Sequence, residues 1–326
     1  MRYDAEQARA LARRAIGNAG ASEAVARSLA NATIAAEIHG RPGVGFAHLL
    51  DYLDGLRHGR IADNAQPLIT FPVPAAIRVD ACQGIAQLGF DQAFDALLHR
   101  AQTFGIAVFA QTNSYTAGEL GYYTRRLAQA GLVALAATNG PALVAAGRAR
   151  VPVYGTNPFS FAAPVEHGMP LVIDQATSAT AYVNLRKAAE HGEPIPEGWA
   201  IDAAGQPTTD ARAALDGLLL AFGGKRGANI ALMVEVLAAG MTGANWSLDC
   251  PPFDQGSDSP AAGLFIAAMA PALWAPDFSA RLAAQLERLS SLGVYMPGRQ
   301  PESREIEIAD SLAAMLEDGS NPARGA

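Results

Sequence analysis

The sequence predicts an α/β protein made of a helical lobe and a sheet domain. Three observations predict this fold class. The first 60 residues show helical apolar spacing, strand-length apolar runs alternate with helical segments from residue 75 to residue 136, and further strand-length runs continue to residue 269. We place the helical lobe at residues 1–70, with residues 278–326 packing back on it, and the sheet domain at residues 71–277.

The lobe is expected to contain three helices, at residues 4–18, 23–39 and 46–57. Ser22 is a typical N-cap residue for the second helix. Residues 40–45, Gly-Arg-Pro-Gly-Val-Gly, cannot continue a helix because they combine a proline with three glycines. We call this segment the elbow.

The sheet domain is expected to alternate strands with helices. The expected strands are residues 75–80, 105–110, 132–136, 151–154, 159–163, 171–173 and 263–269. The expected helices are residues 90–104, 117–130, 228–240 and 278–292. Residues 193–210 are expected to form a long loop, and the tail after Pro297 is expected to pack weakly. Polar residues follow several of the strands, at the position where open α/β sheets tend to bind ligands.

Composition excludes several classes of protein. The chain has 326 residues, is 50% hydrophobic and carries a formal net charge of −7. It has no long basic run, so we expect no nucleic-acid partner, and no apolar stretch of about 18 residues, so we expect no membrane span. The N-terminus lacks a signal peptide's apolar core. With two cysteines and no histidine pair at ligand spacing, we expect a cytoplasmic protein without a disulfide framework or metal site.

A glycine-rich stretch near residue 225 has the pattern of an anion-binding loop. Gly223, Gly224, Lys225 and Arg226 precede an apolar helical pattern, so free amides, a helix dipole and two cations would converge on a phosphate. The alternative is a turn with two solvated cations. No Gly-x-Gly-x-x-Gly follows the first strand, so a nucleotide would not bind in the ordinary Rossmann manner.

With these motifs in place, the chain resembles the malate/L-lactate dehydrogenase type 2 family. That family includes sulfolactate and ureidoglycolate dehydrogenases and Δ1-piperideine-2-carboxylate/Δ1-pyrroline-2-carboxylate reductases. The resemblance is carried by four segments: Gly155-Thr156-Asn157-Pro158, Asp174-Gln175-Ala176-Thr177-Ser178, Pro196-Glu197-Gly198-Trp199-Ala200 and Phe222-Gly223-Gly224-Lys225-Arg226-Gly227. It implies a non-Rossmann NAD(P)-binding fold, a homodimer, NADPH or NADH as cofactor, and a cofactor loop at residues 223–226. Residues 205–210 look especially like the ketimine reductases.

The chain also departs from the family. In an ungapped alignment, the family's Ser-His pair falls on Gly43 and Val44, its carboxylate-binding arginine on His48, and its second histidine on Thr116. A shifted alignment with a gap would place His39 and Gly40 on the family's His-Gly instead.

Because of these departures, several residues remain candidates for catalysis, substrate binding and cofactor binding. Asp174 survives at its family position as a catalytic carboxylate, and His39, His48 or Tyr115 are candidates for a relocated proton donor. Possible substrate contacts are His39, Arg41, Val44, Thr116 and Thr156. Possible cofactor contacts are Asn113, Gly118, Asn139, Asn157, Thr177, Gly223, Gly224, Lys225 and Arg226, and Arg148 or Arg150 for a 2′-phosphate.

These residues favour reduction of a cyclic ketimine carboxylate. A protonated imine already carries its proton, so hydride transfer to it does not need the missing histidine. One alternative is a 2-hydroxy acid dehydrogenase of the malate or lactate type with a relocated proton donor. The other is a cofactor-binding protein that has lost catalysis.

Overall fold

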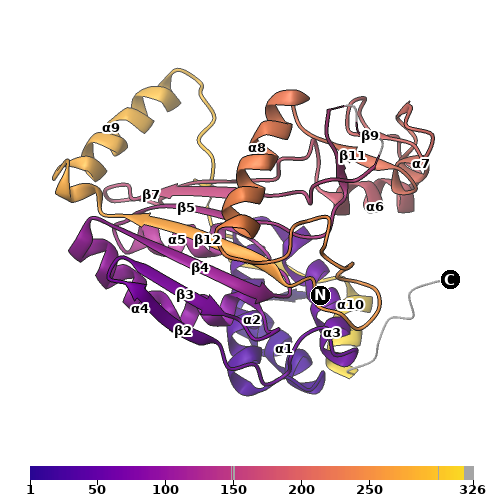
Figure 1. Cartoon of the computed structure of the whole chain (residues 1–326), viewed down its shortest axis with the longest axis horizontal. Helices are drawn as coiled ribbons and strands as arrows, with labels where there is room; N and C mark the ends of the chain where they lie inside the picture. The colour runs from indigo at the N-terminus through magenta and orange to yellow at the C-terminus, as the bar shows by residue number, and fades with distance from the viewer. Residues whose placement is uncertain (148, 150, 300, 319–326) are drawn as a thin grey trace.

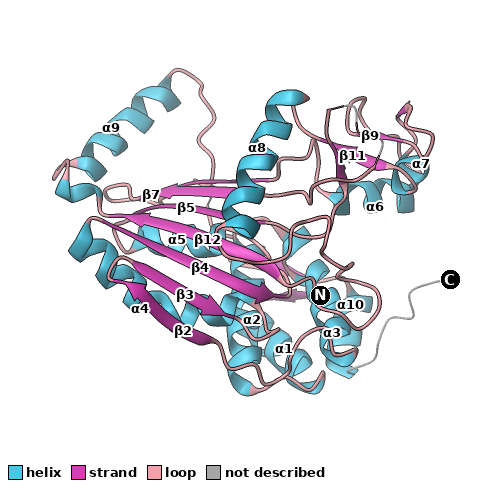
Figure 2. Cartoon of the chain, in the orientation of Figure 1, coloured by secondary structure: helices cyan, strands magenta, loops and turns pink. Residues whose placement is uncertain are grey.

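A computed structural model describes residues 1–147, 149, 151–299 and 301–318. Figures 1 and 2 show a large sheet with helices around it, a group of helices at one end of the strands, and a smaller sheet beside α8. The helical group contains α1 (Ala5–Asn18), α2 (Glu23–Ile38) and α3 (Phe46–Arg57), which confirms the three predicted helices. The elbow between α2 and α3 forms a short 3-10 turn at Pro42–Val44.

The large sheet has seven strands in the order β2-β3-β4-β12-β5-β7-β8. Their bounds are Leu68–Val73, Ala76–Asp80, Ile106–Ser114, Ala262–Met269, Val133–Thr138, Phe159–Ala163 and Leu171–Gln175. The pair β3–β4 is parallel and the other neighbours are antiparallel. Strand β2, absent from the prediction, is largely exposed and carries little burial signal.

Three helices cover the large sheet. Helices α4 (Ala86–Phe104) and α5 (Gly121–Gln129) pack against its strands, and their apolar side chains form one core with β3, β4, β5 and β12. Helix α8 (Lys225–Glu235) and the π-helical turn that continues it, Val236–Gly240, cross in front of the strands in Figure 1. A Cβ on Gly263 would lie 1.8 Å from the Ala238 carbonyl oxygen, so this glycine lets the turn approach β12 closely.

The smaller sheet was not predicted as a unit. It has the order β10-β9-β11-β6, from Pro207–Thr208, Ala200–Ile201, Leu218–Leu220 and Val144–Ala145. Helices α6 (Tyr182–His191) and α7 (Ala211–Leu215) share its apolar core. The predicted strand at residues 151–154 is wrong: only an isolated bridge joins Tyr154 to Val144, since Pro152 has no amide to donate to a ladder.

The C-terminal segment divides in two. Strand β13 (Ile306–Glu307) pairs with β1 (Arg2–Tyr3), and α10 (Asp310–Asp318) packs on α1 with Ala313 and Leu316 buried. The expected weak packing of this tail is therefore wrong, because its apolar residues complete the core of the lobe. Helix α9 (Phe278–Ser291) instead lies beyond the outer end of the large sheet in Figure 1. Within the described part of the chain, no helix has both the length and the apolarity to cross a membrane.

Candidate active site

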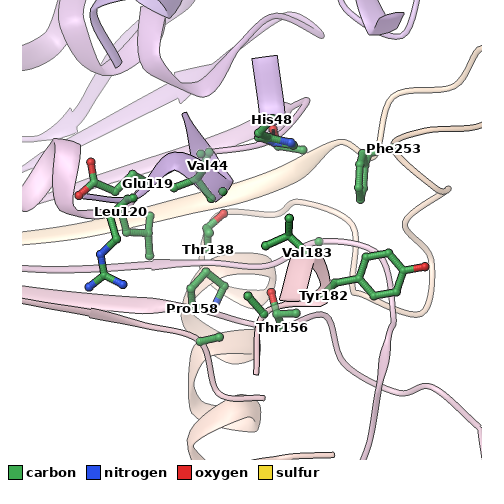
Figure 3. A pocket seen from close by; sticks show the side chains of 18 of the residues that line it. Val44, His48, Glu119, Leu120, Thr138, Thr156, Pro158, Tyr182, Val183 and Phe253 are labelled. Atoms are coloured by element: carbon green, nitrogen blue, oxygen red, sulfur yellow. Dashed lines mark hydrogen bonds between the residues drawn. The ribbon is translucent and has the colours of Figure 1, made fainter. Parts of the chain in front are cut away.

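A cavity of about 310 Å³ lies where the elbow, the large sheet and the start of α6 meet (Figure 3). Its polar and charged walls come from α3, the β4–α5 loop and the ends of β5 and β8. The residues of that wall are Arg41, His48, Asp51, Thr116, Glu119, Thr138, Asn139, Thr156, Asp174 and Arg186. Apolar side chains lie among them, from Val44, Leu120, Pro141, Leu143, Pro158, Val183 and Phe253. The cavity thus combines a few charged groups with apolar surface, as small-molecule sites usually do.

Asp174, at the end of β8, brings a carboxylate to the cavity. One of its oxygens, Oδ2, accepts the backbone N–H of Gly121 at 2.7 Å, at the N-terminus of α5. Burial and, to a smaller extent, the nearby Glu119 carboxylate raise the pKa of Asp174 to about 6, against the opposing effects of the Gly121 amide, Arg41 and Arg125. A carboxyl group with such a pKa can hold a proton or balance a cation near neutral pH.

Glu119 is itself half of a buried ion pair. Its Oε1 lies 2.8 Å from Arg125 Nη2, and both side chains are less than a tenth exposed. The other oxygen, Oε2, has no hydrogen-bond partner within the described residues. The negative charge of Glu119 favours the protonated form of Asp174, and the positive charge of Arg125 opposes that effect.

His39 does not line the cavity. Its side chain is about a tenth exposed and its Nε2 lies 3.8 Å from a Glu302 carboxylate oxygen, in the tail that returns to the lobe. Burial, with a smaller contribution from Arg125, lowers the pKa of His39 to about 4. His39, predicted as a substrate contact or proton donor, therefore lies outside the cavity and is neutral at pH 7.

His48 does line the cavity and is held on both sides. Its Nδ1 lies 2.8 Å from Asp51 Oδ2, and its Nε2 lies 3.1 Å from Thr116 Oγ1. The rings of Tyr52 and Phe253 meet it edge-on, at centroid distances of 4.8 and 5.9 Å. Two predicted residues, His48 and Thr116, are therefore brought together.

Tyr115 does not reach the cavity. Its hydroxyl is buried between two backbone carbonyl oxygens, 2.7 Å from that of Phe253 and 3.1 Å from that of Asp51, and can donate to one at a time. Burial raises its pKa far above the ordinary value. Tyr115, predicted as a proton donor, therefore lies outside the cavity, where its hydroxyl holds the backbone of Phe253.

The predicted cofactor residues fall into two groups. Gly118, Asn139 and the substrate candidate Thr156 line the cavity. Asn113 does not, and its amide donates to Asp80.

Asn157 and Thr177 are buried and engaged elsewhere. The Asn157 amide donates to the Ala231 carbonyl oxygen and to Glu235 Oε2, so it ties β7 to α8 rather than facing a ligand. Thr177 donates to the Thr156 carbonyl oxygen. Arg148 and Arg150 lie outside the described residues.

The glycine-rich stretch forms the exposed start of α8. Gly223 and Gly224 take φ of 56° and 64°, a conformation that favours glycine, and α8 begins at Lys225 without a side-chain cap. Lys225 and Arg226 are exposed at this uncapped end. Free first-turn amides with two adjacent cations fit a phosphate group.

This loop is connected to the cavity through Thr177. The backbone N–H of Phe222 donates to the Thr177 carbonyl oxygen at 3.0 Å, and Thr177 in turn bonds the cavity residue Thr156. A Cβ on Gly227 would lie 2.0 Å from the Phe222 carbonyl oxygen, so the first turn of α8 folds tightly against the loop. Backbone hydrogen bonds thus link the glycine loop to the segment that carries Thr156, while residues 222–227 themselves do not line the cavity.

Comparison with known proteins identifies the family to which the chain belongs. The sequence profile of the family described as malate/L-lactate dehydrogenase matches residues 3–310. The chain belongs to this family of oxidoreductases.

Curated relatives and solved structures cover almost the same length. Over 298 residues the chain is 38% identical to the Δ1-pyrroline-2-carboxylate/Δ1-piperideine-2-carboxylate reductase of Pseudomonas putida, spanning 89% of this chain and 86% of that protein. It is 35% identical to the (2R)-3-sulfolactate dehydrogenase (NADP+) of Chromohalobacter salexigens, over 94% and 92%. The crystal structure of Δ1-piperideine-2-carboxylate reductase from Pseudomonas syringae pvar. tomato superimposes with a TM-score of 0.93 at 32% identity, covering 98% of this chain and 100% of that one.

Two elbow residues line the cavity, Gly43 and Val44, at the positions where the resemblance places the family's Ser-His pair. Val44 has no ionisable group and supplies no proton. A Cβ on Gly43 would lie 3.1 Å from Val183 Cγ1, so a larger side chain at this position would crowd the start of α6.

The residues that line the cavity without having been predicted include Asp51, Glu119, Val183, Arg186 and Phe253. Asp51 had a detectable signal, because it follows His48 by three residues on a predicted helix and so shares its face. Glu119 directly follows the predicted Gly118, whereas Val183, Arg186 and Phe253 come from segments distant in sequence. Within the described ranges, no group of three or more His, Cys, Asp or Glu is placed to bind a metal ion.

Proposed function

We propose that this chain is an NADPH-dependent reductase of cyclic ketimine carboxylates of the Δ1-piperideine-2-carboxylate and Δ1-pyrroline-2-carboxylate type. The observation that carries the proposal is the pairing of Val44 with Asp174 in one cavity. An apolar side chain replaces the family's proton donor, while a buried carboxylate remains. That combination suits a protonated imine, which brings its own proton and a positive charge, better than a ketone.

The nicotinamide cofactor supplies the hydride in this chemistry. Lys225, Arg226 and the first amides of α8 would hold its phosphates, and the cavity would receive its reactive end. Substituting both cations by glutamine is expected to weaken NADPH binding by roughly tenfold or more, because two charge-assisted contacts are lost. Fluorescence titration with NADPH and NADH measures the effect and shows which cofactor the loop prefers. Unchanged affinity for both would contradict this assignment.

Residues of this chain would bind the substrate, exclude water and exchange the proton. Arg41 and His48 line the cavity and would hold the substrate carboxylate. Val44, Leu120 and Phe253 would contact the apolar ring and exclude water. Asp174 would face the imine nitrogen, where its charge stabilises the cationic form and its carboxyl can exchange a proton with the product amine.

Turnover of matched substrates tests the proposal. NADPH oxidation is followed with Δ1-piperideine-2-carboxylate and with pyruvate, each with wild type and with Asp174→Asn. We expect a higher kcat/KM for the imine and a loss of about 100-fold or more in the variant, because a neutral amide stabilises a cation poorly. A higher kcat/KM for pyruvate would overturn the substrate class.

A second candidate is oxidation and reduction of a 2-hydroxy acid with His48 as relocated proton donor. The His48–Asp51 pair at the cavity wall is the observation that favours it. It predicts that His48→Gln abolishes pyruvate reduction. NADPH binding without turnover of either substrate class would instead favour a binding protein that has lost catalysis.

We also propose that the protein is a homodimer and works in the cytoplasm. Large apolar side chains are exposed on α8 and the segment after it, at Leu232, Met233, Val236, Met241, Trp246 and Leu248, and would be covered by a second copy. Cys82 and Cys250 are free thiols, as is usual in a reducing compartment. Light scattering during gel filtration is expected to give twice the monomer mass, and Val236→Glu to shift it toward the monomer. A monomeric wild type would refute the dimer.

A further inference from the structure

Helix α3 begins without a capping side chain of its own. Its N-cap residue is Gly45, which has no side chain to accept the free N–H groups of the first turn. The acceptor comes from the last turn of α2, where Glu37 Oε1 accepts the backbone N–H of Phe46 at 2.7 Å. A carboxylate at this position also interacts favourably with the positive end of the helix dipole. Glu37 therefore caps α3 from the helix that precedes it.

The glycine at the N-cap position leaves the space that this carboxylate occupies. A Cβ on Gly45 would lie 2.8 Å from Glu37 Cδ, so a larger residue at position 45 and the cap from Glu37 would compete for the same space. Burial raises the pKa of Glu37 above its ordinary value, and the hydrogen bond from Phe46 partly offsets that effect. The carboxylate is thus withdrawn from water and committed to the start of α3.

This hydrogen bond closes the base of the elbow. At the α2 end of the elbow, the backbone N–H of Arg41 donates to the Ala36 carbonyl oxygen at 2.8 Å. At the α3 end, the bond from Phe46 to Glu37 returns the chain to the same turn of α2. Residues 40–45 are therefore held between two points that both lie on the end of α2.

The elbow itself forms part of the wall of the cavity. Arg41, Gly43 and Val44 all line it, and Val44 is labelled in Figure 3. Arg41 carries the only polar side chain of the elbow, and its Nη2 donates to the Asp174 carbonyl oxygen at 3.2 Å. Val44 is 37% exposed, so packing alone holds it weakly. The hydrogen bonds at the base of the elbow consequently determine where Arg41 and Val44 lie.

We propose that Glu37 is a positioning residue that holds the elbow, and with it Arg41 and Val44, in the position that binds the substrate. Glu37 does not itself line the cavity. The proposal rests on the proposed function for its substrate. It requires a hydrogen-bond acceptor at the reach of a glutamate side chain, and it does not require the negative charge.

Two substitutions of similar size separate the acceptor from the rest of the side chain. Glu37→Gln keeps an oxygen at the same reach, whereas Glu37→Met has a similar length and no comparable acceptor. Asp4→Ala is the matched control, because Asp4 caps α1 of the same lobe by accepting the backbone N–H of Gln7 at 2.8 Å. Neither Asp4 nor Gln7 lines the cavity.

The experiment uses the full-length protein and two measurements. Hydrogen–deuterium exchange, followed by mass spectrometry without any ligand, reports on the elbow and the first turn of α3. We expect exchange there to become about fivefold faster in Glu37→Met, as for the loss of a typical helix cap, and to stay near wild type in Glu37→Gln and Asp4→Ala.

Calorimetry then measures the binding of picolinate, a planar ring carboxylate that cannot be reduced, to the protein loaded with NADPH. The dissociation constant is expected to rise about threefold or more in Glu37→Met, because part of the population must order its elbow before it binds. It should stay within about twofold of wild type in Glu37→Gln and in Asp4→Ala. The dissociation constant of NADPH should be the same in all four proteins, since the elbow is not expected to contact the cofactor phosphates.

Several results would overturn the inference. These are elbow exchange in Glu37→Met as slow as in wild type, a loss of picolinate binding in Glu37→Gln or Asp4→Ala as large as in Glu37→Met, or no picolinate binding to wild type. If Glu37→Met does not fold, Glu37→Ala removes the same acceptor and takes its place. Failure to reduce any ketimine would refute the proposed function, while elbow exchange and picolinate binding would still decide the role of Glu37.

Discussion

At the scale of single residues, the most unusual group of the cavity is the Asp174 carboxylate, whose ionised form is disfavoured by burial. Asp174 lies close to the buried Glu119–Arg125 pair and accepts one backbone N–H, from Gly121. Its pKa of about 6 in the folded protein compares with an ordinary value of 3.8. Between these two pH values the folded chain binds more protons than the unfolded chain, so stability falls as pH rises from about 4 to about 6 and stays lower above that.

Asp174→Asn is therefore expected to be more stable than wild type at pH 8. A shift of about two pH units corresponds to a cost of up to about 3 kcal/mol for the ionised group, and the amide oxygen can still accept from Gly121. Urea unfolding at pH 8 and pH 4 measures this, with a gain of about 1–3 kcal/mol expected at pH 8 and almost none at pH 4. Glu197→Gln, at an exposed position, serves as control. Equal or lower stability of Asp174→Asn at pH 8 would show that the carboxylate is not strained.

At the scale of elements, α8 links the cofactor loop to the sheet. Its first turn carries the two cations, and its last turn holds Glu235, which is 4% exposed. Glu235 accepts from Asn157 and from both the backbone and hydroxyl of Ser247. Asn157 thus fixes the far end of the helix whose beginning would bind phosphate.

Asn157→Ala is expected to destabilise the protein by about 3 kcal/mol, because it removes a partner of a buried carboxylate. The residue also has a φ of 36°, which alanine tolerates less well than asparagine. We further expect weaker NADPH binding, since α8 loses its register on β7. Denaturant unfolding and NADPH titration check both effects. Asn184→Ala, whose amide donates to the nearby Thr180 hydroxyl, should change each by little. Similar losses in the two variants would argue against a specific role for Asn157.

At the scale of the whole molecule, the two ends of the chain close the helical lobe together. Strand β13 pairs with β1, and Leu316 on α10 is 1% exposed in the core of the lobe. The elbow and α3 belong to that lobe, so the tail supports one wall of the cavity.

Leu316→Ala is expected to cost about 2–4 kcal/mol of unfolding free energy through lost burial and the cavity left behind. Leu292→Ala, at a side chain that is 80% exposed, should stay within about 0.5 kcal/mol of wild type. Thermal or denaturant unfolding compares the pair. If Leu316→Ala were as stable as Leu292→Ala, the tail would not be part of the folded core.

The sequence by itself determined the features that depend on residues close together in the chain. Apolar spacing located α1, α2, α3 and most strands of the large sheet, and glycines with cations marked the start of α8, because period, caps and turn chemistry act over a few residues. The ordered motifs also identified the family. Only the tertiary structure decided which side chains share the cavity. It buries Tyr115 and Asn157, places His39 outside the cavity, and brings Asp51 into contact with His48 and Val183 close to Gly43. Most of these positions depend on how segments that are distant in sequence pack together.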